Sequence, residues 1–472
     1  MNRWFRPLAL VVCTACILCE AVYGDKASHP NIVLFYVDDL GWSDLGYSGS
    51  SFYESPNIDR LANEGVVFDN AYACAPNCAP SRACLMSGMY TPRHGIYTVG
   101  SSARGKSEDR MLFPVENKTV LDDEIDTLPE QLKKLGYQTG HFGKWHLGDD
   151  PTTQGMNVNI AGKIWGSPSG GGYHSPFKFP NLEESKPGVY LTDRISEEAV
   201  QFIEDNQETP FFLYLAHYSV HTPIQPKQEY KAYFDNREPD RGHRNAGYAA
   251  MVRSMDDSLG RVRNALRDLG LDDNTVIIFT SDNGGHGGVT SNRPLRGSKG
   301  MLYEGGIRVP FVAHWSGQFG PARVESAPIV GVDLLPTILT LAGGKPNKKQ
   351  ILDGESLVPI LQQKNHRLET RPIFWHFPAY LERYRGLPEE GPFRTTPASA
   401  IRIGDWKLIR FYESGREEMY DLKSDLSEVN NVRKKYPEIG QRLSDKLDGW
   451  LTQTGAFLPT KRNPKYSGGN RD

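Results

Sequence analysis

A cysteine and an arginine stand four residues apart in the segment 78–82 (CAPSR), which continues into residues 83–88 (ACLMSG). Proline at the third position suits the first turn of a helix, where its missing N–H costs nothing. The pattern therefore predicts Cys78 at a helix N-terminus, in a positive local field that suits an anionic ligand. Arg82 follows about one turn later and can direct its guanidinium to the same ligand. On these residues alone, a buried structural cysteine beside a surface arginine is an equal alternative.

Two segments end in oxygen-bearing side chains after nearly unbroken apolar runs. These side chains are Asp38 and Asp39 after residues 31–37, and Asp282 and Asn283 after residues 275–281. Such runs are typical of strands buried on both faces of a parallel sheet, whose carboxyl ends carry the sites of α/β proteins. Several carboxylate and amide oxygens together suit a hard cation such as Ca²⁺ or Mg²⁺, and zinc is disfavoured because the nearest histidine lies beyond two glycines. A solvated loop is the alternative for either acidic segment alone.

Basic side chains follow further predicted strands or stand in a glycine-flanked loop. They are Lys144 and His146 after residues 137–142, His221 after residues 210–218, and Lys299 within residues 296–300. Lys144 and His146 alternate with a tryptophan, so an extended backbone would point both the same way. Taken singly, each is more often a surface lysine or a hydrogen-bonded histidine than a catalytic group.

Together, and in this order, these motifs resemble those of the type I sulfatases of the alkaline phosphatase-like superfamily, and most of all those of bacterial carbohydrate sulfatases. The resemblance implies that Cys78 is converted to formylglycine (3-oxoalanine) by a formylglycine-generating or sulfatase-maturing enzyme. It also implies one calcium ion, held by the residues that match the family's ligands, which are Asp38, Asp39, Asp282, Asn283 and the modified Cys78. Related phosphatases carry histidine where this chain has Asn283, which favours the sulfatase interpretation.

Hydrolysis of a sulfate ester needs positive groups around its oxygens, a nucleophile in line with the leaving group, and an acid at the leaving oxygen. The resemblance implies that Arg82, Lys144, Lys299 and the metal form the positive cage. The formylglycine hydrate attacks sulfur with one hydroxyl, and its second hydroxyl later expels sulfate and restores the aldehyde. His221 is expected to be the general acid, and His146 the base of the second step.

Several loop residues are candidates for binding the substrate, because aromatic faces, arginine and histidine suit a sulfated sugar. The candidates are His174, His286, Asn292, Arg296, Trp375 and His376. Ordinary loop packing is the alternative for each of them. The resemblance to carbohydrate sulfatases gives galactose or N-acetylgalactosamine 4-sulfate as the expected substrate. The alternatives are a phosphate or phosphonate ester hydrolase of the same superfamily, and a non-catalytic sugar-binding protein with an unmodified cysteine.

The 472 residues exceed the size at which one hydrophobic core keeps growing, so we expect two domains. We predict a catalytic domain over residues 25–350, a smaller domain over 351–458 and a loose tail over 459–472. The resemblance implies a large mixed sheet flanked by helices, followed by a small α+β domain with a four-stranded antiparallel sheet. Residues 400–422 accordingly show strand patterns, and residues 436–451 show the pattern of an amphipathic helix.

Residues 1–24 have the pattern of a cleaved secretory signal, with two arginines, an apolar stretch at 8–18 and short side chains before a cut. The stretch is too short to cross a bilayer with ease, so we expect a secreted or periplasmic protein without a stable membrane span. A lipid anchor at Cys16 or Cys19 is an alternative with a poor sequence match. The net charge of −3 argues against a nucleic-acid partner.

Removal of this segment would leave three cysteines, Cys74, Cys78 and Cys84. Three cysteines are too few for a disulfide framework in a chain of this length. Cys74 and Cys84 are expected to be core thiols, and a disulfide between them in an oxidising compartment is the alternative.

Overall fold

The computed structural model describes Met1 and residues 29–364, 368–384 and 391–467. Apart from Met1, the predicted signal segment at 1–24 lies outside these residues. Within the described ranges, no helix combines the length and the apolar character needed to cross a membrane.

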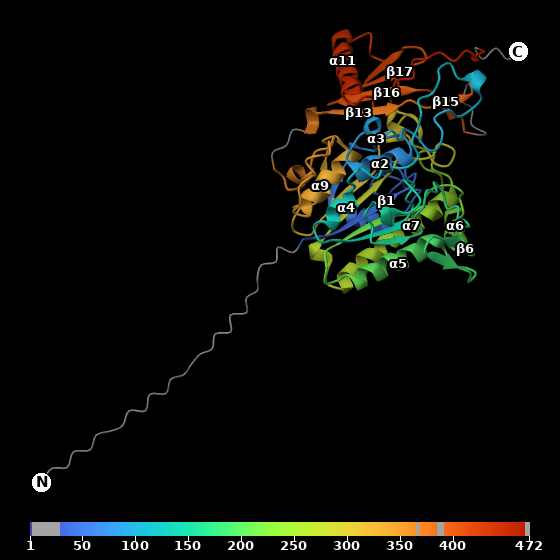
Figure 1. The fold of residues 1–472 in the computed structure, drawn as a ribbon. Coiled ribbons are helices and arrows are strands. Elements are labelled where there is room, and N and C mark those ends of the chain that lie inside the picture. The colour runs from blue at the N-terminus through green and yellow to red at the C-terminus, as the bar shows by residue number, and fades with distance from the viewer. Residues whose placement is uncertain (2–28, 365–367, 385–390, 468–472) are drawn as a thin grey trace.

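An eight-stranded mixed sheet forms the centre of the large domain (Figure 1). Its spatial order is β11-β2-β10-β9-β1-β8-β4-β5, and the five strands from β9 to β5 run parallel. All residues of β1, β8 and β9 are buried, as their apolar runs predict. The strands are β1 (Asn31–Val37), β2 (Val66–Phe68), β4 (Gln138–Gly143), β5 (Val158–Ile160), β8 (Phe211–Ala216), β9 (Thr275–Ser281), β10 (Phe311–His314) and β11 (Arg323–Glu325).

Helices cover both faces of this sheet because successive side chains of a strand point to opposite sides. Ile32, Leu34 and Tyr36 pack with α2 (Cys78–Ser87), α4 (Leu128–Lys133) and α9 (Leu334–Leu341). Alternate residues of the same strand pack with α1 (Pro56–Glu64), α5 (Leu191–Asp205), α6 (Gln228–Phe234) and α7 (Ala246–Asp268). Figure 1 shows β1 between the two groups.

Shorter elements connect these layers. They are β3 (Ala71–Tyr72) paired with β12 (Ile329–Val330), β6 (Phe177–Phe179) paired with β7 (Leu182–Glu184), β14 (Leu381–Glu382) paired with β15 (Phe393–Thr395), and the helices α3 (Thr91–His94), α8 (Glu304–Ile307) and α10 (Val358–Leu361).

The small domain is a four-stranded antiparallel sheet covered by one long helix, at the top of Figure 1. Its strands are β13 (Pro372–Phe377), β16 (Ala398–Ile403), β17 (Trp406–Phe411) and β18 (Glu417–Asp421), and the helix is α11 (Pro437–Gln453). The predicted fold class is therefore confirmed. The boundary near residue 350 between the two domains stays a prediction.

Residues 459–467 are held by the large domain, so the prediction of a loose tail is wrong for them. The side chain of Asn463 is buried and donates from Nδ2 to the carbonyls of Ser107 (2.7 Å) and Arg110 (2.8 Å). The backbone N–H of Phe113 donates to the carbonyl of Lys461 (2.9 Å). A composition rich in proline, lysine and glycine does not reveal that a distant loop satisfies these backbone groups. Residues 468–472 lie outside the described part.

A buried ionic cluster joins the small domain to the large one. Lys407 in β17 places Nζ 2.9 Å from Glu304 Oε1, at the start of α8, and 2.9 Å from Glu428 Oε1. All three side chains are fully buried. Burial by itself would raise the pKa of Glu304, but Lys407 and neighbouring arginines lower it to about 2, whereas burial raises the pKa of Glu428 to about 7. The Lys407 ammonium therefore pairs with both desolvated carboxyl groups, and Arg308 adds a second ion pair to Glu304.

Replacing this lysine by an apolar residue of similar length is expected to destabilise the protein strongly. Lys407→Met leaves Glu428 without its cation and Glu304 with Arg308 alone at ion-pair distance, which costs about 3–5 kcal/mol of unfolding free energy. Urea denaturation measures the loss, and Lys446→Met on the exposed face of α11 is the control, with a change of about 0.5 kcal/mol or less. Equal stability of the two variants would show that the cluster is not stabilising.

Candidate active site

Cys78 is the first residue of α2, as its proline pattern predicts. The Ser81 hydroxyl accepts from the N–H of Ala75 (3.1 Å) and donates to its carbonyl (2.9 Å), which fixes the turn before the helix. Cys78 is 2% exposed, and burial raises the pKa of its thiol to about 12 although Lys144 and Lys299 lower it. An unmodified thiol would thus be protonated at neutral pH and would be a weak nucleophile.

The other two cysteines of the described chain, Cys74 and Cys84, are free and buried. Burial and a hydrogen bond with Cys74 raise the pKa of Cys84 well above its usual value. The expectation that they are core thiols is therefore confirmed.

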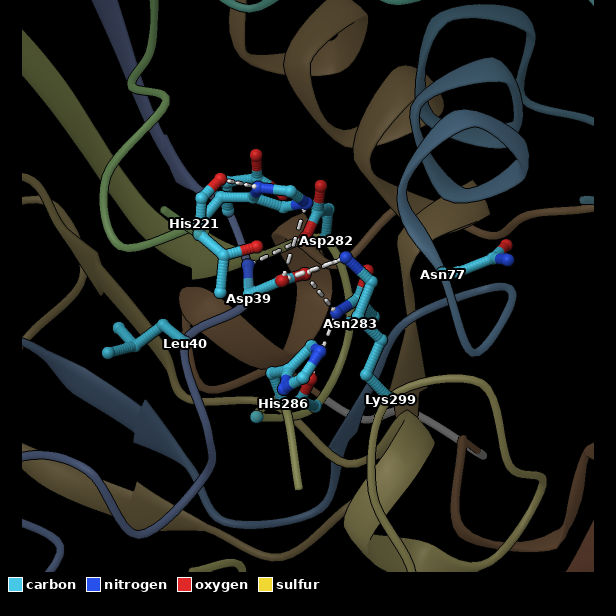
Figure 2. A network of polar contacts seen from close by, with 12 residues as sticks. Asp39, Leu40, Asn77, His221, Asp282, Asn283, His286 and Lys299 are labelled. Atoms are coloured by element: carbon cyan, nitrogen blue, oxygen red, sulfur yellow. Dashed lines mark hydrogen bonds and ion pairs between the residues drawn. The ribbon is translucent and has the colours of Figure 1, made fainter. Parts of the chain in front are cut away.

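The carboxyl ends of β1 and β9 bring four predicted ligands together, and Figure 2 shows three of them, Asp39, Asp282 and Asn283. These strands are neighbours, with Val37 opposite Ser281, so the residues that follow them share one edge of the sheet. The N–H of Asp39 donates to Asp282 Oδ1 (3.2 Å), and Asn283 Nδ2 donates to Asp39 Oδ1 (2.9 Å). The two acidic segments are therefore one site rather than two solvated loops.

Each of the three carboxylates forms an ion pair with a predicted cationic residue. The pairs are Lys144 Nζ with Asp38 Oδ2 (2.7 Å), Lys299 Nζ with Asp39 Oδ1 (2.6 Å), and Arg82 Nη2 with Asp282 Oδ2 (2.8 Å). The first and last pairs are fully buried, whereas Lys299 is 11% exposed. Lys299 is thus the cation of this set that borders the opening of the site.

Arg82 is engaged with protein atoms on every side. Besides Nη2, its Nε also donates to Asp282 Oδ2 (3.0 Å), while Nη1 donates to the carbonyl of Lys144 (2.9 Å) and the hydroxyl of Tyr214 (3.4 Å). In this arrangement the guanidinium orients Asp282 rather than facing the pocket. The predicted direct contact with a substrate anion stays a prediction.

The donor set fits a divalent cation that prefers oxygen. Ligand atoms of Asp38, Asp39, Cys78 and His221 lie within 4.8 Å of one another. Asp38 Oδ1 and Asn283 Oδ1 are buried and have no hydrogen-bond partner among the described residues. Burial and the neighbouring acids raise the pKa of Asp38 to about 8 against the effect of Lys144. A bound cation would satisfy these two oxygens and offset the cost of gathering the acids.

His146 and His221 both lie at this site, although not as the alternation with Trp145 predicts. β4 ends at Gly143, and His146 has a left-handed φ of 66°, so the backbone there is not extended. Burial, followed by Lys144, lowers the pKa of His146 well below its usual value. His221 Nδ1 donates to the carbonyl of Thr222 (2.6 Å), which leaves Nε2 toward the site, 3.7 Å from Asp39 Oδ2.

Of the six predicted substrate-binding residues, His286 lies beside the acidic cluster (Figure 2). Burial lowers its pKa to about 4, opposed by Asp39 and reinforced by Lys299. Its ring packs against Tyr384, with 4.3 Å between the ring centroids. Asn292 instead stabilises the loop after β9, because its side-chain amide accepts a hydrogen bond from the N–H of Gly285 and donates one to the carbonyl of Gly285.

The remaining four candidates contact protein partners elsewhere. Arg296 Nη1 donates to the hydroxyl of Tyr420 and to the carbonyl of Glu428. Trp375 Nε1 donates to the carbonyl of Ala73, and His376 lies between Ser399 Oγ and the carbonyl of Phe457. His174 Nε2 lies 3.1 Å from the carbonyl of Pro226. Trp375 and His376 are also almost fully buried. The packing alternative accounts for these contacts, and we leave the four out of the proposed substrate site.

Three residues border the site without having been predicted, namely Arg104, Tyr384 and Arg394. The Tyr384 hydroxyl donates to the carbonyl of Lys299 (2.7 Å), and Arg394 Nε lies 3.4 Å from the same oxygen. These residues come from segments far from the motifs in sequence. No local pattern marks them, so only the folded chain reveals their position.

Comparisons with known proteins agree with this architecture. The family model "Sulfatase" matches residues 30–344, and the model "N-sulphoglucosamine sulphohydrolase, C-terminal" matches residues 298–453. A "Sulfatase" of Formosa agariphila is 34% identical over 92% of this chain and 90% of its own length. Human N-acetylgalactosamine-6-sulfatase is 35% identical over 74% of this chain and 68% of its own length.

A crystal structure of Ps i-CgsB in complex with k-i-k-neocarrahexaose has a similar fold. The TM-score is 0.75 at 30% sequence identity, and the match covers 92% of this chain and 95% of the other. Together with the family models and the shared geometry, this places the chain in the sulfatase family of the alkaline phosphatase-like superfamily, as a sulfuric ester hydrolase.

Proposed function

We propose that the protein hydrolyses a sulfate ester on a carbohydrate, with galactose or N-acetylgalactosamine 4-sulfate as the expected substrate. The observation that carries this proposal is Cys78 at a helix N-terminus, buried beside three carboxylates and the cations that pair with them. The names of two relatives support a carbohydrate, since one is an N-acetylgalactosamine-6-sulfatase and the other was crystallised with a neocarrahexaose. The 6-sulfate therefore belongs in the same substrate panel.

We infer that Cys78 acts as formylglycine. The high pKa of the buried thiol supports this inference, because a protonated thiol is a poor nucleophile at neutral pH. The hydrated aldehyde would supply an oxygen nucleophile and a second hydroxyl that allows sulfate to leave. The N-terminus of α2 directs its partial positive charge at this position, which favours an anionic substrate there.

One calcium ion would be held by Asp38, Asp39, Asp282, Asn283 and residue 78. The two buried oxygens without partners support this assignment. The ion would supply positive charge next to the ester oxygens. Lys144 and Lys299 add charge of the same sign, and both already act on the Cys78 thiol in this structure. An ester bound there would therefore be neutralised from several directions.

The two histidines would move protons. Burial lowers the pKa of His221 to about 3, so its imidazole is neutral at neutral pH in the present state. The negative charge of a bound sulfate ester favours the protonated imidazole, which prepares Nε2 to donate to the leaving oxygen. His146, neutral and with Nδ1 free of a hydrogen-bond partner among the described residues, suits a base.

Mass spectrometry of the Cys78 peptide tests the modification, using protein made together with a formylglycine-generating enzyme. We expect side-chain sulfur and two hydrogens to be replaced by one oxygen, and the aldehyde to react with a hydrazide. Sulfate release from sulfated sugars should then appear in the wild type and be absent in Cys78→Ala. A converted residue 78 that releases phosphate but no sulfate would favour the phosphoesterase alternative. An unconverted cysteine without any hydrolysis would favour a sugar-binding protein.

Metal removal tests the cation site. A chelator should abolish most sulfate release and added calcium should restore it, because the ion balances the buried acids. Calcium at about 100 times its dissociation constant should stabilise the fold by roughly 2.7 kcal/mol, visible as a higher melting temperature. Asp282→Asn should lose this shift, whereas Asp445→Asn on exposed α11 should keep it. A melting temperature that does not respond to calcium would contradict the assignment.

Substitution of the general acid gives a further kinetic prediction. His221→Ala should lower kcat by about 10²–10⁴-fold, the usual contribution of a positioned acid. The loss should shrink for sulfate esters with a good leaving group, such as an activated aryl sulfate, because their leaving oxygen needs less protonation. His29→Ala, next to the amino end of β1 and so at the opposite edge of the sheet, is the control. Equal losses on aryl and sugar sulfates would argue against this role.

A further inference from the structure

Two arginines beside the site are not used by the proposed reaction. Arg394 in β15 donates from Nη1 to the carbonyl of Glu382, and its Nε lies 3.4 Å from the carbonyl of Lys299. Its guanidinium also covers the ring of Tyr384, with 4.2 Å from Cζ to the ring centroid. Because Tyr384 in turn packs against His286, Arg394 belongs to the border of the active site.

Arg104 reaches the same border from the large domain. Its neighbour Gly105 packs against the ring of Phe393, so closely that a Cβ on this glycine would lie 2.5 Å from a ring carbon. Arg104 and Arg394 therefore flank one tight contact between two chain segments. Arg104 Nη2 donates to the carbonyl of Val99 (2.6 Å), which holds the side chain in place.

The charges of these two arginines have no ion-pair partner in the part of the chain that the structure describes. Within residues 29–364, 368–384 and 391–467, no carboxylate lies within ion-pair distance of either guanidinium. Burial and then Arg394 lower the pKa of Arg104, and among the described groups Glu382 and Cys78 act in the opposite direction. Two like charges thus stand close together next to Lys299. An anion bound between them would relieve their repulsion.

We propose that Arg104 and Arg394 bind a second anionic group of the saccharide substrate, beside the sulfate ester that is hydrolysed. This inference rests on the proposed function and makes the preferred substrate doubly charged. Guanidinium groups match the oxygens of both sulfate and carboxylate, so the second group is a further sulfate ester or the carboxylate of a uronic acid. The backbone and ring contacts of the two arginines leave them oriented before the sugar arrives.

Three sugars separate the alternatives in a kinetic experiment. They are N-acetylgalactosamine 4-sulfate, N-acetylgalactosamine 4,6-disulfate, and a disaccharide of glucuronic acid and N-acetylgalactosamine 4-sulfate. In the double variant Arg104→Gln/Arg394→Gln, kcat/KM on a doubly charged sugar should fall about 10–100-fold, as expected for lost charged hydrogen bonds. The loss should appear as a higher KM, while kcat stays nearly constant. Because Arg394 also contacts the carbonyl of Lys299, the singly charged sugar can lose some activity as well. The readout is therefore the additional loss of about 10–100-fold on a doubly charged sugar relative to the singly charged one. The sugar that responds tells whether the second group is sulfate or carboxylate.

Arg416→Gln is the matched control, because this arginine of the small domain pairs with Glu418 and covers Phe411. It should behave as the wild type on all three sugars. Equal losses of the double variant on all three, or no loss on any, would overturn the proposed subsite. Such a result would leave the sulfatase activity of the wild type untouched, so the two proposals fail separately.

Calorimetric binding provides a readout that does not need turnover. Calcium-loaded Cys78→Ala protein is titrated with each of the three sugars. At least one doubly charged sugar should bind more tightly than the 4-sulfate, and the double arginine substitution should remove that difference. If the wild type hydrolyses none of the sugars, the proposed function fails on these substrates while this titration still decides the subsite. An unchanged affinity difference would overturn it.

Discussion

Burying three carboxylates side by side at the carboxyl ends of two strands costs free energy, and the rest of the candidate active site is arranged to offset that cost. Asp38, Asp39 and Asp282 meet there because β1 and β9 are parallel neighbours that end at the same level. Such a concentration of negative charge is stable only when cations from elsewhere compensate it. α2, the end of β4 and the loop before α8 each supply one, so three separate parts of the chain are fixed in place by the same requirement.

The same requirement explains why the small domain matters for a site that lies in the large one. Lys299 belongs to the loop that leads into α8, and α8 begins with Glu304, which Lys407 of the small domain neutralises. Arg394 and Tyr384 bind the backbone carbonyl of Lys299 itself. The cation nearest the opening is thus held by residues from both domains, including Arg394 of β15 and Tyr384 just after β14.

Much of the fold and most residues of the candidate site were predictable, because their signals are local. The apolar runs before Asp38 and Asp282 mark two central strands, and the proline after Cys78 marks the start of α2. Side chains whose role depends on a distant partner were not predictable in this way. Trp375 and His376 have the composition of a sugar site but are buried where β13 packs on the large domain. Arg394 carries no motif and borders the site through the fold alone.

The anchored segment at 459–467 has a consequence for where the functional unit ends. It pairs with residues 107–113, directly after the loop that carries Arg104. A shortened protein that stops after α11 would retain every strand of both sheets and every proposed ligand of the metal. It would nevertheless lose the contacts that hold residues 107–113, which follow Arg104, so the proposed second anion site depends on chain beyond the last helix.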